Sequence, residues 1–134
     1  MGGTKDYLSG GGFGKTRYQQ VGMTANGIKI LKRDDAEFPN TPKYSNTPNT
    51  MYAARDSRDR RVKQVTIYGG GSDGREKSKD IDIGHGHTNP DGRKFLENEI
   101  HVHVWSNGGR SPYARKPSKK ERRLLMIARY GKTK

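Results

Sequence analysis

The sequence predicts an α+β fold, in which a small antiparallel four-stranded β-meander carries a C-terminal amphipathic helix on one face and follows a long N-terminal loop region. Two observations in the second half of the chain lead to this fold class. Two pairs of segments with alternating apolar residues are each joined by polar, turn-forming residues, which is typical of β-hairpins. Near the C-terminus the apolar residues recur with helical spacing, which indicates a helix after the strands.

The N-terminal half is expected to contain little regular structure. Residues 1–15 are predicted to form a flexible glycine-rich leader, ahead of a single basic domain at residues 16–134. Residues 27–31 are a candidate short strand after an Asn-Gly turn signal, and residues 33–38 are a candidate helical turn. Residues 38–49 contain three prolines, which remove backbone donors and exclude a continuous helix, so this segment is predicted to be a loop.

The four strands are expected to form two β-hairpins, at about residues 50–68 and 79–105. The second hairpin contains the strong turn signal Asn-Pro-Asp-Gly at residues 89–92. In its last strand, the alternation of side chains places Ile100, Val102 and Val104 in the core. The opposite, polar face of the same strand is expected to display Glu99, His101, His103 and Trp105.

A helix is predicted at about residues 119–130. Ser118 and Glu121 have the spacing of a capping box, in which each side chain satisfies the backbone donor of the other, and Gly131 suits the C-terminal end. The apolar side of this helix consists of Leu124, Leu125 and Ala128. Its basic residues are expected to point outward: Lys119, Lys120, Arg122, Arg123 and Arg129.

The charge balance of the chain is strongly basic. Lys and Arg number 27 against 14 Asp and Glu, a formal net charge of +13, which favours a polyanionic partner, most commonly nucleic acid. The absence of cysteine excludes disulfides, thiolate metal sites and cysteine nucleophiles. No apolar run approaches the roughly 20 residues of a membrane span, and the N-terminus does not resemble a signal peptide. A soluble chain without a membrane partner is therefore expected.

All four histidines fall between residues 85 and 103, in two His-x-His pairs. The alternation of strand side chains places His101 and His103 together on the polar face, roughly 6–7 Å apart. Asp82, His85 and His87 are close enough in the predicted hairpin to lie beside them. This arrangement predicts a functional site.

Three interpretations of the site remain open. Imidazoles that titrate near neutral pH can act as general base and general acid in the cleavage of RNA by its own 2′-hydroxyl, with His101, His103 and His85 as the catalytic residues and no cofactor. Alternatively, the imidazoles bind a divalent metal such as zinc, with His85, His87, His101, His103 and Asp82 as the ligand set. In the third interpretation, the histidines are structural residues of strands and turns, with no chemical role.

Basic and aromatic side chains near the histidines are candidates for binding the substrate. Cations stabilise the charge that develops on a reacting phosphate, and aromatic rings can stack on unpaired bases. The candidate substrate-binding residues are Lys63, Arg110, Arg115, Trp105 and Tyr68. In the first hairpin, the alternation at residues 61–68 does not decide which side chains lie on the polar face.

Four segments together resemble a family of bacterial toxin domains: residues 62–68 (Val-Lys-Gln-Val-Thr-Ile-Tyr), 79–85 (Lys-Asp-Ile-Asp-Ile-Gly-His), 89–92 (Asn-Pro-Asp-Gly) and 101–105 (His-Val-His-Val-Trp). The sequence is similar in these segments to the C-terminal ribonuclease toxin domains of polymorphic, contact-dependent inhibition and prophage-borne toxins, which are of the barnase and colicin kind.

The resemblance implies a metal-independent ribonuclease that cleaves tRNA or rRNA in the bacterial cytoplasm. It also implies delivery as part of a larger secreted or phage-borne protein, and neutralisation by an acidic immunity protein. His101 and His103 would lie at the site, with His85, Asp82 and Lys63 as neighbours.

A different class of function is also compatible with the sequence. A non-catalytic nucleic-acid-binding protein, associated with a phage or with the ribosome, would use its positive charge for binding and leave the histidines without a chemical role. Its binding would be sensitive to salt and would survive replacement of both strand histidines, His101 and His103, by alanine.

Overall fold

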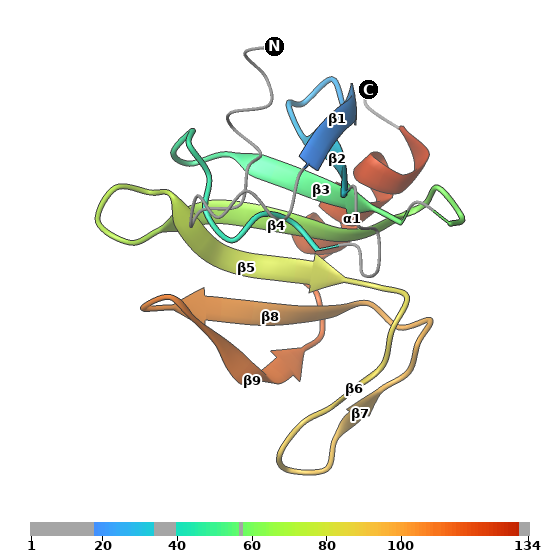
Figure 1. Ribbon diagram of the computed structural model, residues 1–134. Coiled ribbons are helices and arrows are strands. Elements are labelled where there is room, and N and C mark those ends of the chain that lie inside the picture. The colour runs from blue at the N-terminus through green and yellow to red at the C-terminus, as the bar shows by residue number, and fades with distance from the viewer. Residues whose placement is uncertain (1–17, 34–39, 57, 132–134) are drawn as a thin grey trace.

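The computed structural model describes residues 18–33, 40–56 and 58–131, which form a seven-stranded sheet, a two-stranded hairpin and one helix (Figure 1). The strands of the sheet, in spatial order, are β1 (Tyr18–Met23), β2 (Lys29–Arg33), β3 (Met51–Arg55), β4 (Val62–Gly70), β5 (Glu76–Asp82), β8 (His101–Ser106) and β9 (Gly109–Arg115). The hairpin consists of β6 (His87–Thr88) and β7 (Lys94–Phe95), and the helix is α1 (Lys119–Tyr130).

The α+β class is confirmed, but the predicted number of strands is wrong. The four predicted strands are β3, β4, β5 and β8, which are neighbours in this order and pair antiparallel. The sheet continues on one side with β2 and β1 and on the other with β9. The candidate strand at residues 27–31 corresponds to β2. The predicted leader at residues 1–15 and most of the candidate helical turn at 33–38 lie outside the described residues.

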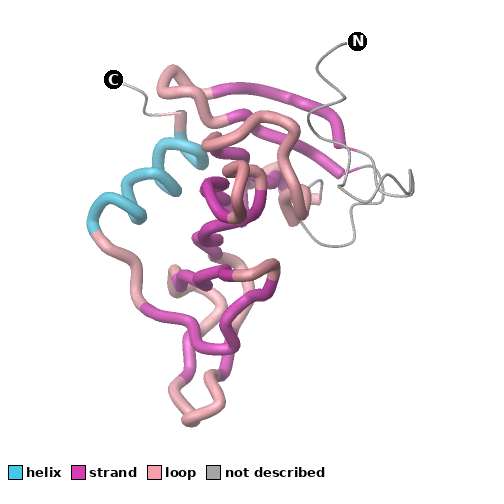
Figure 2. The backbone as a smooth tube through the Cα atoms, turned by 90° about the vertical axis from the view of Figure 1, so that its left-hand side faces the viewer, coloured by secondary structure: helices cyan, strands magenta, loops and turns pink. Residues whose placement is uncertain are grey.

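One face of the sheet forms the apolar core. Ala53, Val65, Ile81 and Val102 are direct neighbours on four adjacent strands, and all four are fully buried. Such a row of small and β-branched side chains makes a flat surface on which a helix can pack. Helix α1 lies on this face with Leu125 buried against the strands, as the view along the sheet shows (Figure 2).

The helix has the predicted bounds and caps. The Ser118 hydroxyl accepts a hydrogen bond from the backbone N–H of Glu121, and the Glu121 carboxylate accepts one from the backbone N–H of Ser118. Gly131 ends the helix in the left-handed conformation, with φ of 68°. Four of its basic residues are exposed as expected: Lys119, Lys120, Arg122 and Arg123. The outward orientation predicted for Arg129 is wrong, because its guanidinium donates to the Val62 carbonyl.

The other face of the sheet is polar, and its side chains form two rows across three strands. Gln64, Asp82 and His101 are direct neighbours on β4, β5 and β8. Two residues away on the same strands, the second row consists of Thr66, Asp80 and His103. These polar side chains are all buried.

The first cover of the polar face is the connection between β2 and β3. These two strands are the parallel pair in the sheet, so the chain between them must return to the starting end of the sheet. Thr41 in this connection lies over the polar face, where its backbone N–H and its hydroxyl donate to the Gln64 side-chain oxygen, each at 2.9 Å.

The β6–β7 hairpin supplies the second cover, beside β8 and β9. Its Asn89 side chain donates to the Ala114 carbonyl at 2.9 Å and accepts from the Ala114 N–H at 2.7 Å. Asn89 therefore pairs with the edge strand β9 as another strand would. Phe95 of the same hairpin is buried, with its ring centroid 5.6 Å from that of His101.

Among residues 18–33, 40–56 and 58–131, the structure contains no helix with the length and apolar composition of a membrane span.

Candidate functional site

The four histidines meet at one place on the polar face. The ring centroids of His101 and His103 are 5.3 Å apart. His85 lies edge-on to His101 at 5.0 Å, and His87 lies edge-on to His103 at 4.5 Å. The segment between β5 and the β6–β7 hairpin therefore brings one histidine pair against the other, as the sequence predicted. We call these four side chains the histidine cluster.

The exposure predicted for His101 and His103 is wrong. Both side chains are fully buried, because the β6–β7 hairpin covers them. Val104, predicted in the core, is instead 43% exposed, and the register shifts between β8 and β9 next to it. His85 is the most exposed member of the cluster, with a side chain 54% exposed, and His87 is partly exposed. A substrate would therefore reach His85 and not the two strand histidines.

The hydrogen bonds of the buried imidazoles define which ring nitrogen faces the cluster. The Nδ1 atom of His101 lies 3.4 Å from the Glu99 carbonyl oxygen, and Nδ1 of His103 lies 3.2 Å from the Ser111 carbonyl oxygen. Because a carbonyl oxygen only accepts, each Nδ1 carries the proton in these bonds. Each Nε2 is then an acceptor, and among the described residues neither Nε2 has a hydrogen-bond partner.

Burial also sets the charge of these imidazoles. Desolvation lowers the pKa of His101 and of His103 to about 4, and it lowers the pKa of His85 as well. His101 and His103 are thus neutral at pH 7, with a free lone pair on Nε2. A neutral buried imidazole is a good ligand but a poor general acid.

Asp82 lies next to His101 and His85 and is only 1% exposed. Its Oδ1 accepts a hydrogen bond from the Gln64 amide at 2.8 Å, and its Oδ2 lies 3.9 Å from His85 Nε2 and 4.0 Å from His101 Nε2. Burial, and after it the nearby Asp80 carboxylate, raise the pKa of Asp82 to about 7. Within the described part of the chain, no Lys or Arg forms an ion pair with Asp82.

Asp80, in the second row, differs from Asp82 in having strong partners. It accepts hydrogen bonds from the Thr66 hydroxyl at 2.5 Å and from the Trp105 indole at 2.7 Å, and Lys77 lies 3.4 Å away. The Asp80 carboxylate therefore has two hydrogen-bond donors and a cation beside it. Asp82 in the first row has no Lys or Arg ion partner among the described residues.

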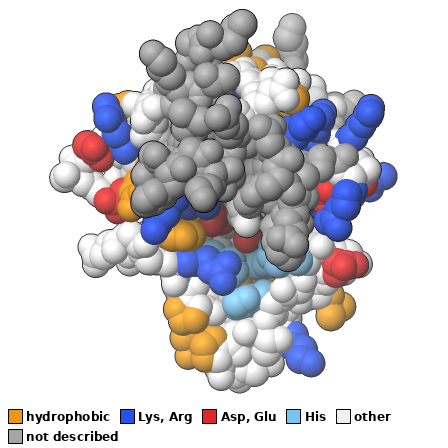
Figure 3. All heavy atoms as spheres, viewed as in Figure 1, with side chains coloured by type: hydrophobic (Ala, Val, Ile, Leu, Met, Phe, Trp, Pro, Cys, Tyr) orange, Lys and Arg blue, Asp and Glu red, His pale blue; other side chains and the backbone are white. Residues whose placement is uncertain are grey.

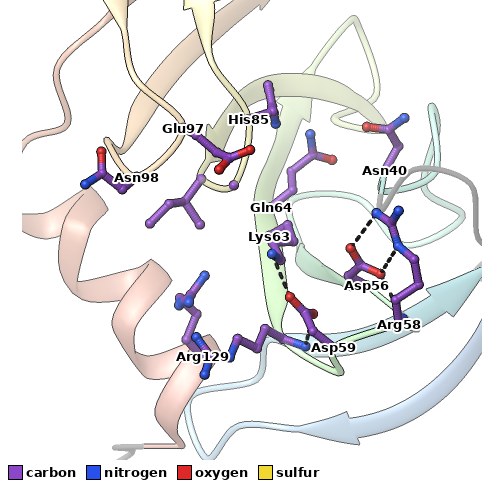
Figure 4. A pocket seen from close by; sticks show the side chains of 13 residues that line it. Asn40, Asp56, Arg58, Asp59, Lys63, Gln64, His85, Glu97, Asn98 and Arg129 are labelled. Atoms are coloured by element: carbon purple, nitrogen blue, oxygen red, sulfur yellow. Dashed lines mark hydrogen bonds and ion pairs between the residues drawn. The ribbon is translucent and has the colours of Figure 1, made fainter.

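A pocket of about 770 Å³ opens beside His85, where β4 begins and β5 ends (Figure 4). Its lining includes four basic residues, Arg58, Arg61, Lys63 and Arg129, and three acidic ones, Asp56, Asp59 and Glu97. Two of the cations are paired, Arg58 with Asp56 and Lys63 with Asp59, both at 2.9 Å.

Arg61 forms no ion pair among the described residues, and its side chain is exposed. Figure 3 shows histidine surface next to Lys and Arg side chains on this side of the molecule.

Three of the five predicted substrate-binding residues line a pocket, and the other two, Tyr68 and Arg115, do not. Lys63 lines the pocket beside His85, and Arg110 and Trp105 line a second depression of about 290 Å³ over the polar face. Tyr68 is 2% exposed and its hydroxyl donates to the Pro42 carbonyl, so its ring is not available for stacking. Arg115 forms an ion pair with Glu121 at the start of α1, away from both pockets.

Neither protein-family models, nor curated proteins, nor solved structures give a match to this chain. Its function is therefore inferred from the side chains of the site.

Several residues of the site were not predicted from the sequence. Gln64 and Thr66 hold the two aspartates, Asp80 orients Trp105, and Asn89 fastens the covering hairpin. A signal for the first two was present, because Gln64 and Thr66 alternate with the core residues Val65 and Ile67, but only the pairing with β5 decides which face they occupy.

Proposed function

We propose that this domain is a ribonuclease, of the toxin type that the sequence resembles. The observation that carries the proposal is the convergence of four histidines and the buried Asp82, of which the exposed His85 lines a pocket that also contains four basic and three acidic residues. Imidazoles beside a phosphate-binding surface are the groups needed to transfer the protons of phosphodiester cleavage.

The accessible residues suggest how RNA would bind. An unpaired exposed guanidinium, Arg61, is suited to a phosphate, because its planar donors match phosphate oxygens. His85 would then contact the reacting phosphodiester, since it is the exposed histidine at the wall of the pocket. His101 and His103 are positioning residues in this proposal, because they are buried behind His85 and His87.

The burial of His101 and His103 changes the expected chemistry. In cleavage without a metal, the RNA 2′-hydroxyl attacks phosphorus, its proton passes to a base, and the departing 5′-oxygen receives a proton from an acid. Neither His101 nor His103 can reach a substrate in the described arrangement, because both side chains are fully buried. The proposal therefore assigns substrate contact and one of the two proton transfers to His85, leaves the other proton transfer to water, and leaves the two strand histidines to hold the site in shape.

The test is cleavage of labelled tRNA and total RNA by the full chain, with and without chelator. We expect His85→Ala to lower kcat by about 10² or more, and Arg61→Ala to weaken RNA binding with a smaller effect on kcat. Arg93→Ala is the matched control for Arg61, because Arg93 is exposed between β6 and β7 and does not line the pocket. Absence of cleavage by the wild-type domain, or cleavage unchanged in His85→Ala, would contradict the proposal.

The same experiment separates a second function. The exposed cations Lys119, Lys120, Arg122 and Arg123 lie on α1 and are suited to contact with a polyanion. Salt-sensitive RNA binding without cleavage by the wild-type chain would favour a non-catalytic nucleic-acid-binding protein. For the toxin, an acidic immunity protein that covers His85 and the pocket is the partner we propose.

A further inference from the structure

We propose that Asp82, His85 and His101 bind a divalent transition-metal ion, zinc or a metal with similar ligand preferences, at the wall of the pocket. The role of this ion in cleavage rests on the proposed ribonuclease function, in which His85 would act as a ligand and the ion would take over its contact with the phosphate. Binding of the ion does not depend on that function. The proposal starts from three donor atoms that come together at one end of the first polar row.

The geometry of these donors is close to that of a three-ligand site. One donor atom from each of the three residues lies within 4.8 Å of the others. Ligands of a tetrahedral zinc ion, at bond lengths of about 2.0–2.1 Å, lie about 3.4 Å from one another. The separations of Asp82 Oδ2 from the two imidazole nitrogens, 3.9 and 4.0 Å, are about 0.5–0.6 Å longer than this. Rotation of the half-exposed His85 side chain can shorten the first separation. The second would shorten only by a shift of about 0.6 Å between the buried Asp82 and His101 side chains when the ion binds.

An unpartnered donor atom is the second observation. The Nε2 atom of His101 is fully buried and, within the described part of the chain, has no hydrogen-bond partner. Burying such an acceptor without a partner is unfavourable. A metal ion at this position would use the lone pair that the fold otherwise leaves unsatisfied.

The buried carboxylate provides a third observation. Asp82 is held in the interior without an ion pair to any Lys or Arg of the described residues, although the neighbouring Asp80 has Lys77 beside it. Buried carboxylates are normally paired with a cation or coordinate a metal. A divalent ion would supply the missing positive charge at Asp82.

The surrounding hydrogen bonds match those found around metal ligands. A ligating imidazole usually donates its other N–H to a carbonyl or carboxylate, which fixes the ring and its tautomer. His101 does this toward the Glu99 carbonyl. The Gln64 amide donates to the far oxygen of Asp82 and so turns Oδ2 toward the two histidines. Gln64 is thus a positioning residue for the ion.

The ligand types indicate which metals fit. Two imidazole nitrogens and one carboxylate oxygen suit zinc and its neighbours better than magnesium, which prefers oxygen ligands and keeps its waters. Three protein ligands leave a coordination position open. His85 and Gln64 both line the 770 Å³ pocket, so the open position would face the space in which a phosphate oxygen of RNA binds.

Metal binding is measured without RNA, by titration calorimetry with Zn²⁺ on the full chain freed of any affinity tag. We expect one equivalent to bind, Co²⁺ to give the visible absorption bands of a low-coordinate site, and Mg²⁺ not to compete. His85→Ala and Asp82→Asn should each weaken zinc binding by at least about 100-fold, because even substitutions around the ligands cost about 10–100-fold. Gln64→Ala removes a residue that positions a ligand, so it should weaken zinc binding by about 10–100-fold.

Two features keep the result interpretable. His85 is half exposed, and asparagine at position 82 keeps the shape of the side chain and an acceptor for Gln64, so both variants should fold. His87→Ala is the matched control, because His87 belongs to the same cluster but its Nε2 lies 2.9 Å from the Pro112 carbonyl oxygen. Circular dichroism confirms the fold of each variant.

The outcomes distinguish the site from the function. No zinc binding by the wild-type chain, or equal affinity in wild type, His85→Ala and Asp82→Asn, would overturn the metal site. Loss of binding in His87→Ala with retention in His85→Ala would overturn the ligand set. Zinc binding without RNA cleavage in any metal would leave the site standing and refute the ribonuclease. RNA cleavage by a chain that binds no zinc would refute the metal site and leave the proposed ribonuclease standing.

Discussion

Replacement of Glu121 by glutamine should destabilise the fold through one small cluster of charges. The Glu121 side chain is 4% exposed and accepts from two nitrogens of Arg115 at 2.8 Å, from Lys79 at 2.6 Å and from the Ser118 backbone at 2.8 Å. These bonds connect the start of α1 to strands β5 and β9. Glutamine keeps the shape of the side chain but removes the charge that both cations require.

The size of the effect follows from the exposure of the partners. Breaking a fully buried ion pair costs about 3–5 kcal/mol. Arg115 and Lys79 are 47% and 30% exposed, so water partly replaces the lost carboxylate. We therefore expect Glu121→Gln to lower the free energy of unfolding by about 3 kcal/mol at pH 7, at the low end of that range. For a chain of this length the Tm should fall by about 10 °C.

The effect should depend on pH in a defined direction. The Arg115 guanidinium, first, and then Lys79 and the Ser118 N–H hold the pKa of Glu121 far below the ordinary glutamate value of 4.5. A depressed carboxyl pKa gives stability that is present above the unfolded pKa and is lost as the pH falls toward the folded pKa. At pH 3 the wild type loses about 1.36 × (4.5 − 3), or about 2 kcal/mol, of this contribution. At pH 3, the difference in the free energy of unfolding between wild type and Glu121→Gln should therefore shrink to about 1 kcal/mol.

Urea unfolding at pH 7 and pH 3 measures the difference in the free energy of unfolding between wild type and Glu121→Gln at each pH. Trp105, the single tryptophan, is the fluorescent reporter. Glu97→Gln is the matched control: Glu97 is exposed, so its replacement should change stability by less than about 0.5 kcal/mol. A difference below about 1 kcal/mol for Glu121→Gln at pH 7, or one that is equal at both pH values, would refute the reasoning.

Three further predictions concern the pocket and its cover. Gly84 has φ of +96°, and an added Cβ would lie 2.7 Å from Lys63 Cδ, whereas Gly92 has φ of +92° with open space around it. Gly84→Ala should therefore cost more stability than Gly92→Ala, by about 1 kcal/mol or more in urea unfolding; an equal cost would show that Lys63 simply moves aside. Asn89→Ala removes two hydrogen bonds to Ala114, and faster hydrogen exchange of the Ala114 amide should follow, while unchanged exchange would mean that Asn89 does not fasten the hairpin. RNA affinity should fall with rising salt, and Arg61→Ala should reduce the slope of log K against log salt by about 1; an unaltered slope would place Arg61 outside the RNA-binding surface.

Much of the centre of the fold could be predicted because it obeys simple periodicities. Strand β8 and helix α1 have clear periods of two and about 3.6, and the capping box marks the helix start within one residue. The outer strands lack such patterns. Strand β9 contains Pro112 and several exposed polar residues, because it is an edge strand with one unpaired side. Composition alone does not separate such a strand from a loop.

The site was predicted in part. The sequence indicated that Asp82 and the histidines come together, since strand alternation and the short connection from β5 to β6 decide that. It could not indicate the burial of His101 and His103, because the covering hairpin depends on a contact between Asn89 and Ala114, 25 residues apart. Nor could it decide the face of Gln64, which depends on the register between β4 and β5.

The parallel pairing of β2 with β3 has a consequence for how such a domain could diversify. Because the chain must travel the length of the sheet between these strands, every sequence with this topology carries a long connection there. Its residue Thr41 is anchored on the row that contains Asp82. Asn40 of the same connection lines the pocket, so substitution there would alter what enters the pocket while Thr41 and Pro42 keep their bonds to β4. Substrate preference and the residues of the histidine cluster could thus change independently.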